Sequence, residues 1–355
     1  MELKDTAKEI REGESLDIDK VSAYLNDHLD RKTGPLTVKQ FPGGYSNLTY
    51  LLSDGKTEMV LRRPPIGAKI KSAHDMGREF RILSALKPVF PYCPTPLCHC
   101  EDESVIGAPF YVMERLSGII LRKELPEGLS LTPQMMKGLC EKLLDIQVEL
   151  HTIDVKKNGL DFLGKPEGYV KRQVEGWSER YRKARTDDAP DFEVVMGWLK
   201  EKMQKDTGHP GIVHNDYRFD NVVLDEKNPM NIIGVLDWEM ATYGDPLMDL
   251  GNSMAYWIEK NDPEDIQTLR PAPTNLPGAL TRKELVDRYA EKTGREISAF
   301  DFYYAFGLFR LAVIVQQIYN RFYHGITKDK RFGMLIFGVH ILEKRVMAVI
   351  EQSTL

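Results

Sequence analysis

Three polar residues stand at fixed offsets in the segment HNDYRFDN, which covers residues 214–221. Their order, His214, Asp216 and Asn221, fits the pattern H-x-D-x-x-x-x-N, in which the Asp orients an acceptor hydroxyl and the Asn binds Mg²⁺ during phosphoryl transfer. Asp237 follows sixteen residues later, at the end of the apolar run IIGVL. The alternative is that these residues only form turns and cap a strand.

The residues between Asn221 and Asp237 predict a β-hairpin. VVL (222–224) and NIIGVL (231–236) are typical of strands, and the turn-forming residues DEKNP (225–229) separate them. A hairpin brings its two ends together, so Asn221 and Asp237 should share one small volume. Two oxygen ligands in one place are what a phosphate-bound Mg²⁺ needs. We therefore favour the catalytic interpretation over the structural one.

A glycine pair in the N-terminal half could lie against phosphate groups. The segment FPGGYSNLTY places Gly43, Gly44, Ser46 and Asn47 between two strand-like runs. Bare backbone N–H groups can approach phosphate oxygens closely at such a turn. A glycine pair between strands is more often a simple hairpin turn, but the downstream Asp and Asn residues favour contact with phosphate.

Arg62 and Glu79 are candidates for an ion pair that would hold the nucleotide. In the strand-like run EMVLRR, alternation puts Val60 and Arg62 on one face and Leu61 and Arg63 on the other. Glu79 lies beside the apolar face of the predicted helix KSAHDMGREFRILSALK (71–87). We expect Glu79 to turn inward and pair with Arg62, as a strand Lys pairs with a helix Glu in kinases. Otherwise both are solvated surface charges.

The pattern of the chain changes near residue 117 and predicts an α+β protein with two lobes. Short β-type runs precede this point (LTVKQF, NLTYLLS, EMVLRR and APFYVME), whereas helical patterns dominate beyond it, apart from a β-type stretch over 211–236. We expect an N-terminal helical extension over 1–35, a nucleotide-binding lobe over 36–117 and a catalytic and acceptor-binding lobe over 118–355. Backbone groups from Glu114 to Leu116 would bind adenine at the hinge.

Composition limits the class of protein. The 355 residues are 42% hydrophobic and 28% charged, with a net charge of -5, which is typical of a globular protein and not of a nucleic-acid-binding surface. The charged N-terminus resembles no signal peptide, so we expect a cytoplasmic protein with reduced cysteines. CPTPLCHC (93–100) lacks a second ligand pair at zinc-site spacing, and FGMLIFGVHIL (332–342) is too short to span a membrane.

The sequence resembles the aminoglycoside phosphotransferase and choline kinase superfamily, and within it the phosphotransferases related to a domain fused to acyl-CoA dehydrogenases in animals. The segments that carry the likeness are GGYSN, VLRRPP, GREFRIL, APFYVMERLSG, HNDYRFDN, VLDWEMATYGDPLMDLG and FGLFRLAVIVQQI. The resemblance implies a protein-kinase-like fold, ATP as the donor, Mg²⁺ at Asn221 and Asp237, and Asp216 as the catalytic residue. It also implies that His214 supports the loop and is not a general base.

Two departures distinguish the chain from protein kinases. Arg62 stands where those enzymes have Lys, and a planar guanidinium is not equivalent to a point charge. Asp237 is followed by Trp238 and Glu239, and GDPLMDLG arrives within eight residues, which leaves no room for an activation segment. These features argue against a protein kinase.

The acceptor is predicted less directly. The amphipathic helix GYVKRQVEGWSERYRKAR (168–185) is rich in Arg and Lys, which favours a neutral or anionic hydroxyl compound, with a hydroxyacyl thioester as one candidate. Arg310 interrupts an apolar helix and must have a partner, either an acid such as Asp249 or the substrate. The alternatives are an aminoglycoside or choline-type kinase, and a pseudokinase that binds nucleotide without transfer.

Overall fold

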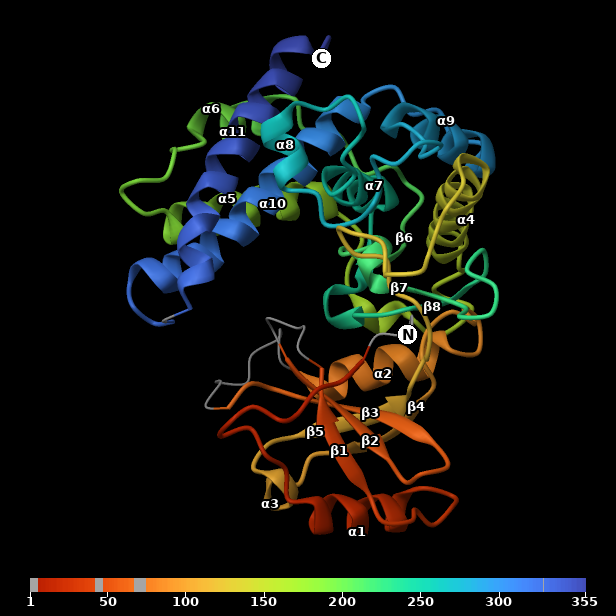
Figure 1. The fold of residues 1–355 in the computed structure, drawn as a ribbon. Helices are drawn as coiled ribbons and strands as arrows, with labels where there is room; N and C mark the ends of the chain where they lie inside the picture. The colour runs from red at the N-terminus through yellow and green to blue at the C-terminus, as the bar shows by residue number, and fades with distance from the viewer. Residues whose placement is uncertain (1–5, 42–46, 67–74, 328) are drawn as a thin grey trace. The chain divides into compact units, whose positions relative to one another are not determined.

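The computed structural model describes residues 6–41, 47–66, 75–327 and 329–355 (Figure 1). The chain divides into two compact units that interleave along the sequence. The first contains Met1–Ile120, Lys157–Leu160 and Asn221–Ala241, and the second contains Leu121–Lys156, Asp161–Asp220 and Thr242–Leu355. The segment 221–241 therefore groups by its contacts with the first unit. The division into three consecutive domains stays a prediction.

An antiparallel sheet forms the body of the first unit. Within the described residues its five strands have the order β1-β2-β3-β5-β4. The strands are β1 (Thr37–Gln40), β2 (Leu48–Ser53), β3 (Glu58–Arg63), β4 (Pro96–Cys100) and β5 (Phe110–Glu114). Four of them match the predicted β-type runs. The sequence did not predict β4, because the prolines and cysteines of CPTPLCHC hide the alternation of its side chains.

One face of this sheet is covered by α1 (Ile18–His28), and the two together form a hydrophobic core. Val21 and Leu25 of α1 are fully buried beside Tyr50 and Leu61 of the sheet. Cys98 and Cys100 of β4 belong to the same core, and burial raises the pKa of Cys98 to about 12. These two cysteines therefore serve as packed core residues.

The first unit also contains α2 (Met76–Leu86), α3 (Glu103–Ile106) and a hairpin of β7 (Val222–Leu224) with β8 (Ile232–Val235). The helix α2 begins later than predicted, because the side chain of Asp75 caps it by accepting a hydrogen bond from the backbone N–H of Arg78 (2.8 Å). Residues 71–74 of the predicted helix lie outside the described residues. The hairpin confirms the one that the sequence predicted.

The second unit is mainly helical, as the sequence predicted. Its helices are α4 (Pro133–His151), α5 (Tyr169–Ala184), α6 (Glu193–Glu201), α7 (Pro246–Ala255), α8 (Glu264–Thr268), α9 (Arg282–Thr293), α10 (Phe300–Tyr323) and α11 (Leu335–Gln352). A short antiparallel pair, β6 (Gly211–Val213) with β9 (Thr242–Gly244), accompanies them. The strand β9 was not predicted, since three residues are too few to show alternation. No helix in the described ranges is both long and apolar enough to cross a membrane.

The helix α10 packs against α5, α7 and α11 (Figure 1). Two glycines allow the close crossing with α7: a Cβ atom at Gly307 would lie 2.2 Å from the carbonyl oxygen of Gly251. Backbone therefore meets backbone at this point, and a larger residue at either position would force the helices apart. The crossing fixes the positions of the side chains that follow Gly251 on α7 and Gly307 on α10.

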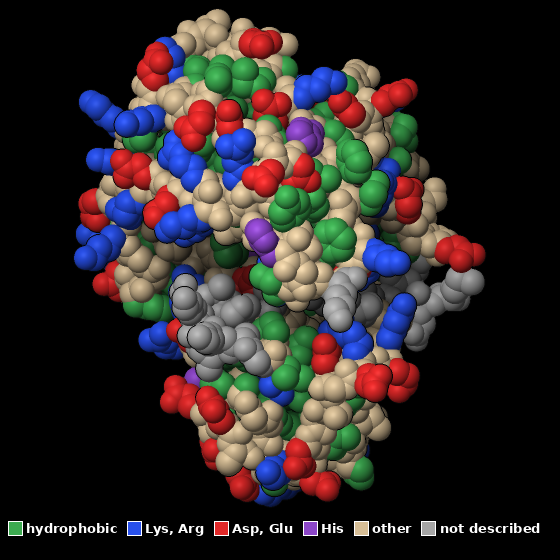
Figure 2. All heavy atoms as spheres, turned by 90° about the vertical axis from the view of Figure 1, so that its left-hand side faces the viewer, with side chains coloured by type: hydrophobic (Ala, Val, Ile, Leu, Met, Phe, Trp, Pro, Cys, Tyr) green, Lys and Arg blue, Asp and Glu red, His purple; other side chains and the backbone are tan. Residues whose placement is uncertain are grey.

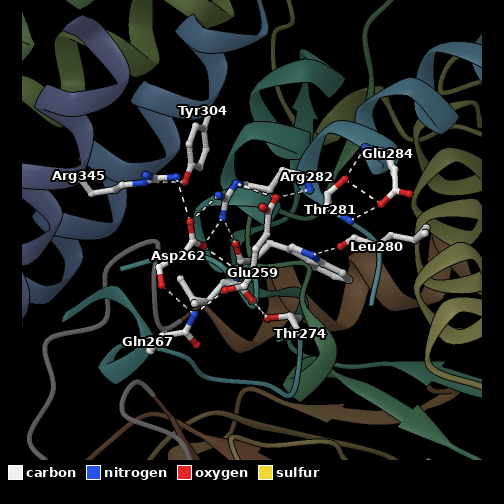
Figure 3. Close-up of polar contacts among 12 residues, drawn as sticks. Glu259, Asp262, Gln267, Thr274, Leu280, Thr281, Arg282, Glu284, Tyr304 and Arg345 are labelled. Carbon is white, nitrogen blue, oxygen red and sulfur yellow. Dashed lines mark hydrogen bonds and ion pairs between the residues drawn. The ribbon is translucent and has the colours of Figure 1, made fainter. Parts of the chain in front are cut away.

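A charged network ties the segment after α7 to α9, α10 and α11 (Figure 3). Asp262 accepts two hydrogen bonds of 2.7 Å from Arg282 and one of 3.2 Å from Arg345. Both guanidinium groups also lie over the ring of Tyr304, at 5.2 and 5.9 Å. Burial alone would raise the pKa of Asp262, but the hydrogen bonds and charge of Arg282 hold this pKa below its ordinary value.

We expect Asp262→Asn to lower the free energy of unfolding by about 3 kcal/mol at pH 7, since it removes the carboxylate that Arg282 and Arg345 share and leaves Arg282 paired with Glu259 alone. Because the pKa of Asp262 is lowered on folding, its contribution is present above its unfolded pKa of about 4 and is lost as the pH falls below that value. Chemical denaturation at several pH values measures both effects. The control Asp287→Asn removes an exposed pair with Lys283 and should change stability by less than about 0.5 kcal/mol. Equal losses in the two variants would contradict the prediction.

Candidate active site

Arg62 lies at the centre of a buried ionic cluster in the first unit. Its Nη1 atom lies 3.1 Å from Oε1 of Glu79, and both Nη atoms donate to Oδ1 of Asp237 at 3.2 Å. Arg62 is 8% exposed and Glu79 is 3% exposed. The neighbouring Arg63 points to the other face and donates to the carbonyl oxygen of Ile106. The predicted ion pair between Arg62 and Glu79 is therefore confirmed, and strand alternation is its cause.

A third carboxylate, Glu239, belongs to the same cluster. Its Oε2 atom lies 3.4 Å from Arg62 and accepts a hydrogen bond of 2.8 Å from the side chain of Asn47. Burial would lower the pKa of Arg62, but the charges of Glu79, Asp237 and Glu239 raise this pKa well above its ordinary value. Burial raises the pKa of Glu79, and the charge of Arg62 opposes that shift. Arg62 thus stays charged among a surplus of carboxylates.

The β7–β8 hairpin brings together the backbone next to Asn221 and the backbone next to Asp237, the two predicted metal ligands. The backbone N–H of Leu236 donates to the carbonyl oxygen of Asn221 at 2.8 Å, and Val222 pairs with Val235 in the register of the hairpin. Asn221 and Asp237 therefore stand at the same end of the β7–β8 hairpin, as the spacing of the motifs predicted. Carboxylate and amide oxygens are hard ligands, so the donor set fits Mg²⁺.

Asp237 has an unusual backbone. Its φ angle of +67° lies in the left-handed region, which costs a residue other than glycine about 1–3 kcal/mol. Asp and Asn tolerate this region better than most residues. The side chain is 35% exposed, and Arg62 contacts only its Oδ1 atom. The backbone therefore presents a partly accessible carboxylate at the end of the hairpin.

The other predicted nucleotide contacts are only partly described. Gly43, Gly44 and Ser46 lie outside the described residues. The backbone N–H of Glu114 donates to the carbonyl oxygen of Thr95, and its carboxylate accepts from the N–H of Thr95 and from Lys87. Leu116 packs on β8, where a Cβ atom at Gly234 would lie 2.1 Å from its Cδ1 atom. Adenine binding by Glu114 and Leu116 stays a prediction.

In the second unit, Asp249 of α7 holds the loop that carries Asp216. Its carboxylate accepts hydrogen bonds from the backbone N–H groups of His214 (3.0 Å) and Asn215 (2.6 Å) and lies 2.9 Å from Nε2 of His151. Burial would raise the pKa of Asp249, but these hydrogen bonds and the nearby His151 lower it. Asn215 adopts a left-handed φ of +66°. A buried, ionised carboxylate thus fixes a strained loop.

Asp216 is held from both sides. Its backbone N–H donates to the ring of His214 at 3.2 Å, which fits the supporting role that the resemblance implies for this buried histidine. Its carboxylate contacts Arg218 at 3.1 Å (Oδ1 to Nε) and 3.3 Å (Oδ2 to Nη2). Arg218 also reaches Asp220 at 2.9 Å and lies over the ring of Tyr256 at 4.6 Å.

Two candidate site residues, Arg218 and Glu239, were missed from the sequence. Arg218 stands two positions after the predicted site residue Asp216, and Glu239 stands two positions after Asp237. Each places a charge next to the predicted residue. This short offset was the available signal. It was weak because the side chains of a turn or a 3₁₀ segment can point in any direction, so spacing alone does not show which charges meet.

Comparison with known proteins identifies the family. The model of the phosphotransferase enzyme family matches residues 37–282. The chain belongs to this family. It is 34% identical over 318 residues to acyl-CoA dehydrogenase family member 10 of Mus musculus, covering 88% of this chain and 29% of that protein. The chain thus spans less than a third of the length of this relative.

Solved structures show that the chain has the protein-kinase-like fold of this family. A putative aminoglycoside phosphotransferase from Ralstonia eutropha JMP134 is 30% identical, with a TM-score of 0.81 that covers 96% of this chain and all of that one. A thermostable aminoglycoside phosphotransferase variant, in a ternary complex with AMP-PNP and hygromycin B, has a TM-score of 0.56 at 13% identity and covers 94% and 99% of the two chains. The second likeness concerns the fold alone.

The contact between Arg62 and Glu79 should appear as energetic coupling. We expect Arg62→Met and Glu79→Gln to be non-additive in the free energy of unfolding, with a coupling of about 1–3 kcal/mol, because each variant removes the same contact. Urea denaturation of the four proteins of the cycle measures it. Arg63→Met combined with Glu79→Gln is the matched control, since Arg63 points to the opposite face. Additivity within about 0.5 kcal/mol in the Arg62 cycle would refute the coupling.

Replacing the carboxylate that holds the loop should destabilise the second unit. Asp249→Asn removes a buried charge and one acceptor, so we expect a loss of about 3 kcal/mol in the free energy of unfolding. Hydrogen exchange of the amides of His214 and Asn215, which donate to this carboxylate, should accelerate. If both amides stay as protected as in the parent, Asp249 does not anchor the loop.

Proposed function

We propose that the chain is an ATP- and Mg²⁺-dependent O-phosphotransferase that moves the γ-phosphate to a hydroxyl group of a small metabolite. The observation that carries this proposal is the meeting of Asn221 and Asp237 at one end of the β7–β8 hairpin, joined by the hydrogen bond between Leu236 and Asn221. Membership of a phosphotransferase family and the Arg62–Glu79 pair support it.

The first unit would bind the nucleotide. Gly43, Gly44, Ser46 and Asn47 would surround the phosphates with backbone and side-chain donors. Asn221 and Asp237 would hold Mg²⁺, which supplies positive charge to the phosphate oxygens during transfer. The guanidinium of Arg62, oriented by Glu79, would face the same phosphates. The backbone from Glu114 to Leu116 would bind adenine.

The second unit would supply the group that acts on the acceptor. Asp216 would orient the hydroxyl and accept its proton as the new O–P bond forms. Arg218 contacts both oxygens of this carboxylate, which favours the ionised form that can accept a proton. Asp249 and His214 would keep the loop in position while the proton moves.

The alternatives differ in the acceptor or in the absence of transfer. A pseudokinase commonly lacks one of the three polar residues, but this chain has Asp216, Asn221 and Asp237. An aminoglycoside or a choline-type acceptor is cationic and would meet Arg218 beside Asp216. The name of the murine relative favours a hydroxyacyl thioester as a candidate acceptor. Measuring ADP formation with hydroxyacyl-CoA compounds, aminoglycosides, choline and sugars tests these possibilities, and no Mg²⁺-dependent transfer to any compound would contradict the proposal.

Two isosteric variants should separate the roles of the carboxylates. Asp237→Asn keeps a residue that tolerates the left-handed backbone but removes the charge, so Mg²⁺-dependent nucleotide binding should weaken. Asp216→Asn should still bind ATP with Mg²⁺, while transfer falls by roughly 10²-fold or more. Calorimetric titration with Mg·AMP-PNP and an ADP-release assay distinguish binding from transfer. Unchanged transfer in Asp216→Asn, or unchanged metal-dependent binding in Asp237→Asn, would remove that residue from its role.

A further inference from the structure

Arg310 is a buried cation that has no acidic partner among the described residues. It lies in the middle of α10 and is 3% exposed. In the described part of the chain, no carboxylate forms an ion pair with its guanidinium and no side chain or backbone oxygen accepts a hydrogen bond from it. The predicted structural pair with Asp249 is wrong, because Asp249 is occupied by His151 and by the loop amides of His214 and Asn215.

The contact that the structure gives Arg310 is with an aromatic ring. Its guanidinium carbon lies 5.0 Å from the centre of the Trp177 ring of α5. The guanidinium lies over this ring, and its five N–H donors lie in one plane and point to its edges. A stacked guanidinium can therefore still donate two parallel hydrogen bonds to a carboxylate or phosphate. An unpaired buried cation is costly, so an anion supplied by a ligand would remove an existing penalty.

Arg310 and the loop of Asp216 have neighbouring residues in common. The helix α7 carries Asp249, which holds that loop, and Tyr256 follows its last residue and lies under the guanidinium of Arg218. Burial raises the pKa of Tyr256, the charge of Asp216 raises it further, and the charges of Arg218 and Arg310 oppose the shift. The charges of both Asp216 and Arg310 thus act on the buried phenol of Tyr256.

The packing of the helices also connects Arg310 with the loop that carries Asp216. The helices α7 and α10 touch at Gly251 and Gly307, and Arg310 follows Gly307 by about one turn. Tyr169, at the start of α5, has its hydroxyl 3.4 Å from Oδ1 of Asn215, next to Asp216 in the loop. Arg310 and Asp216 therefore lie on elements that pack together within the second unit.

The exposed cations of α5 are less suited to select an anion. Lys183 pairs with Glu179 at 2.5 Å and Arg182 with Glu193 at 2.7 Å. Arg172 donates to the backbone of the preceding loop. On the face shown in Figure 2, Lys and Arg side chains are interspersed with Asp and Glu side chains. The predicted basic face of this helix is thus largely neutralised by local pairs.

We propose that Arg310, stacked on Trp177, binds an anionic group of the phosphate acceptor, so that the acceptor is a hydroxylated carboxylate or phosphate ester. This inference rests on the proposed function, because it names the substrate class of the same site. Arg310 is a specificity-determining residue in this scheme: the bond to the anion fixes one end of the acceptor, and Asp216 acts on its hydroxyl. A cationic acceptor would meet a buried positive charge and be rejected.

The test measures binding without nucleotide, so it does not depend on transfer. The probes are two matched pairs, 3-hydroxybutyrate against 3-hydroxybutyramide and glycerol 3-phosphate against glycerol, titrated at constant ionic strength. Tryptophan fluorescence and the shift in Tm report binding. The carboxylate pair and the phosphate pair distinguish the two sources of the anion. We expect at least one anion to bind while its neutral counterpart does not.

Three variants of the parent assign the binding to Arg310. Arg310→Met should weaken anion binding by roughly 10- to 100-fold, which is typical of a lost charge-assisted hydrogen-bond pair. Arg310→Lys keeps the charge but not the planar fork and should bind with intermediate affinity. Arg180→Met is the matched control: Arg180 is exposed and lies 4.7 Å from the same Trp177 ring, so its loss should change anion affinity by less than about twofold. Circular dichroism checks that each variant is folded.

The outcomes are separable from those of the proposed function. If neither anion binds the parent, or if folded Arg310→Met and Arg310→Lys bind the anion as the parent does, the inference is overturned, whatever the transfer assays show. If anion binding depends on Arg310 but no ADP forms with any acceptor, the anion site stands and the proposed transferase activity fails. If the neutral members of both pairs bind as well as the anions, Arg310 does not select the acceptor.

Discussion

The loop that carries Asp216 depends on one buried carboxylate, Asp249. Removing a carboxylate from water costs several kcal/mol unless hydrogen bonds replace the lost solvation. Asp249 receives them from His151, from Gln147 and from the backbone of His214 and Asn215. The same hydrogen bonds that stabilise the charge therefore determine where the loop runs and hold Asn215 in a left-handed conformation. Asp216 is the next residue, so the same hydrogen bonds also determine its position.

A guanidinium has the corresponding role in the first unit. Arg62 contacts Glu79, Asp237 and Glu239 and so connects β3, α2 and the segment after β8. A lysine ammonium is a compact point charge, whereas the planar fork of arginine reaches several carboxylates in different directions. The guanidinium of Arg62 can therefore contact three carboxylates at once. The cluster keeps more carboxylates than cations.

The cations of the second unit fall into two groups. Arg282 and Arg345 are satisfied by Asp262, and the exposed cations of α5 mostly meet carboxylates or backbone oxygens nearby. Arg310 differs, because it is buried and has an aromatic ring in place of an acid. Paired charges stabilise the fold and are not available to a ligand. Arg310 meets no carboxylate in the described part of the chain, so its charge could still bind an anion from a ligand.

The sequence alone determined the features that depend on neighbours along the chain. Strand alternation separated Arg62 from Arg63, and the hairpin signal joined Asn221 to Asp237, because both follow from local backbone geometry. Most strands of the sheet and the helix α5 were predicted for the same reason, while β4 and β9 were missed because one lacks a clear alternation and the other is too short.

Tertiary structure alone decided the partners of charges that are far apart in sequence. Arg310 and Trp177 are 133 positions apart, and they meet because α5 packs against α10. Asp249, the acid expected for Arg310, accepts hydrogen bonds from the loop of Asp216 instead. The spacing of residues along the sequence could not reveal this. Residue types and offsets state which charges exist, but only packing decides which of them are paired.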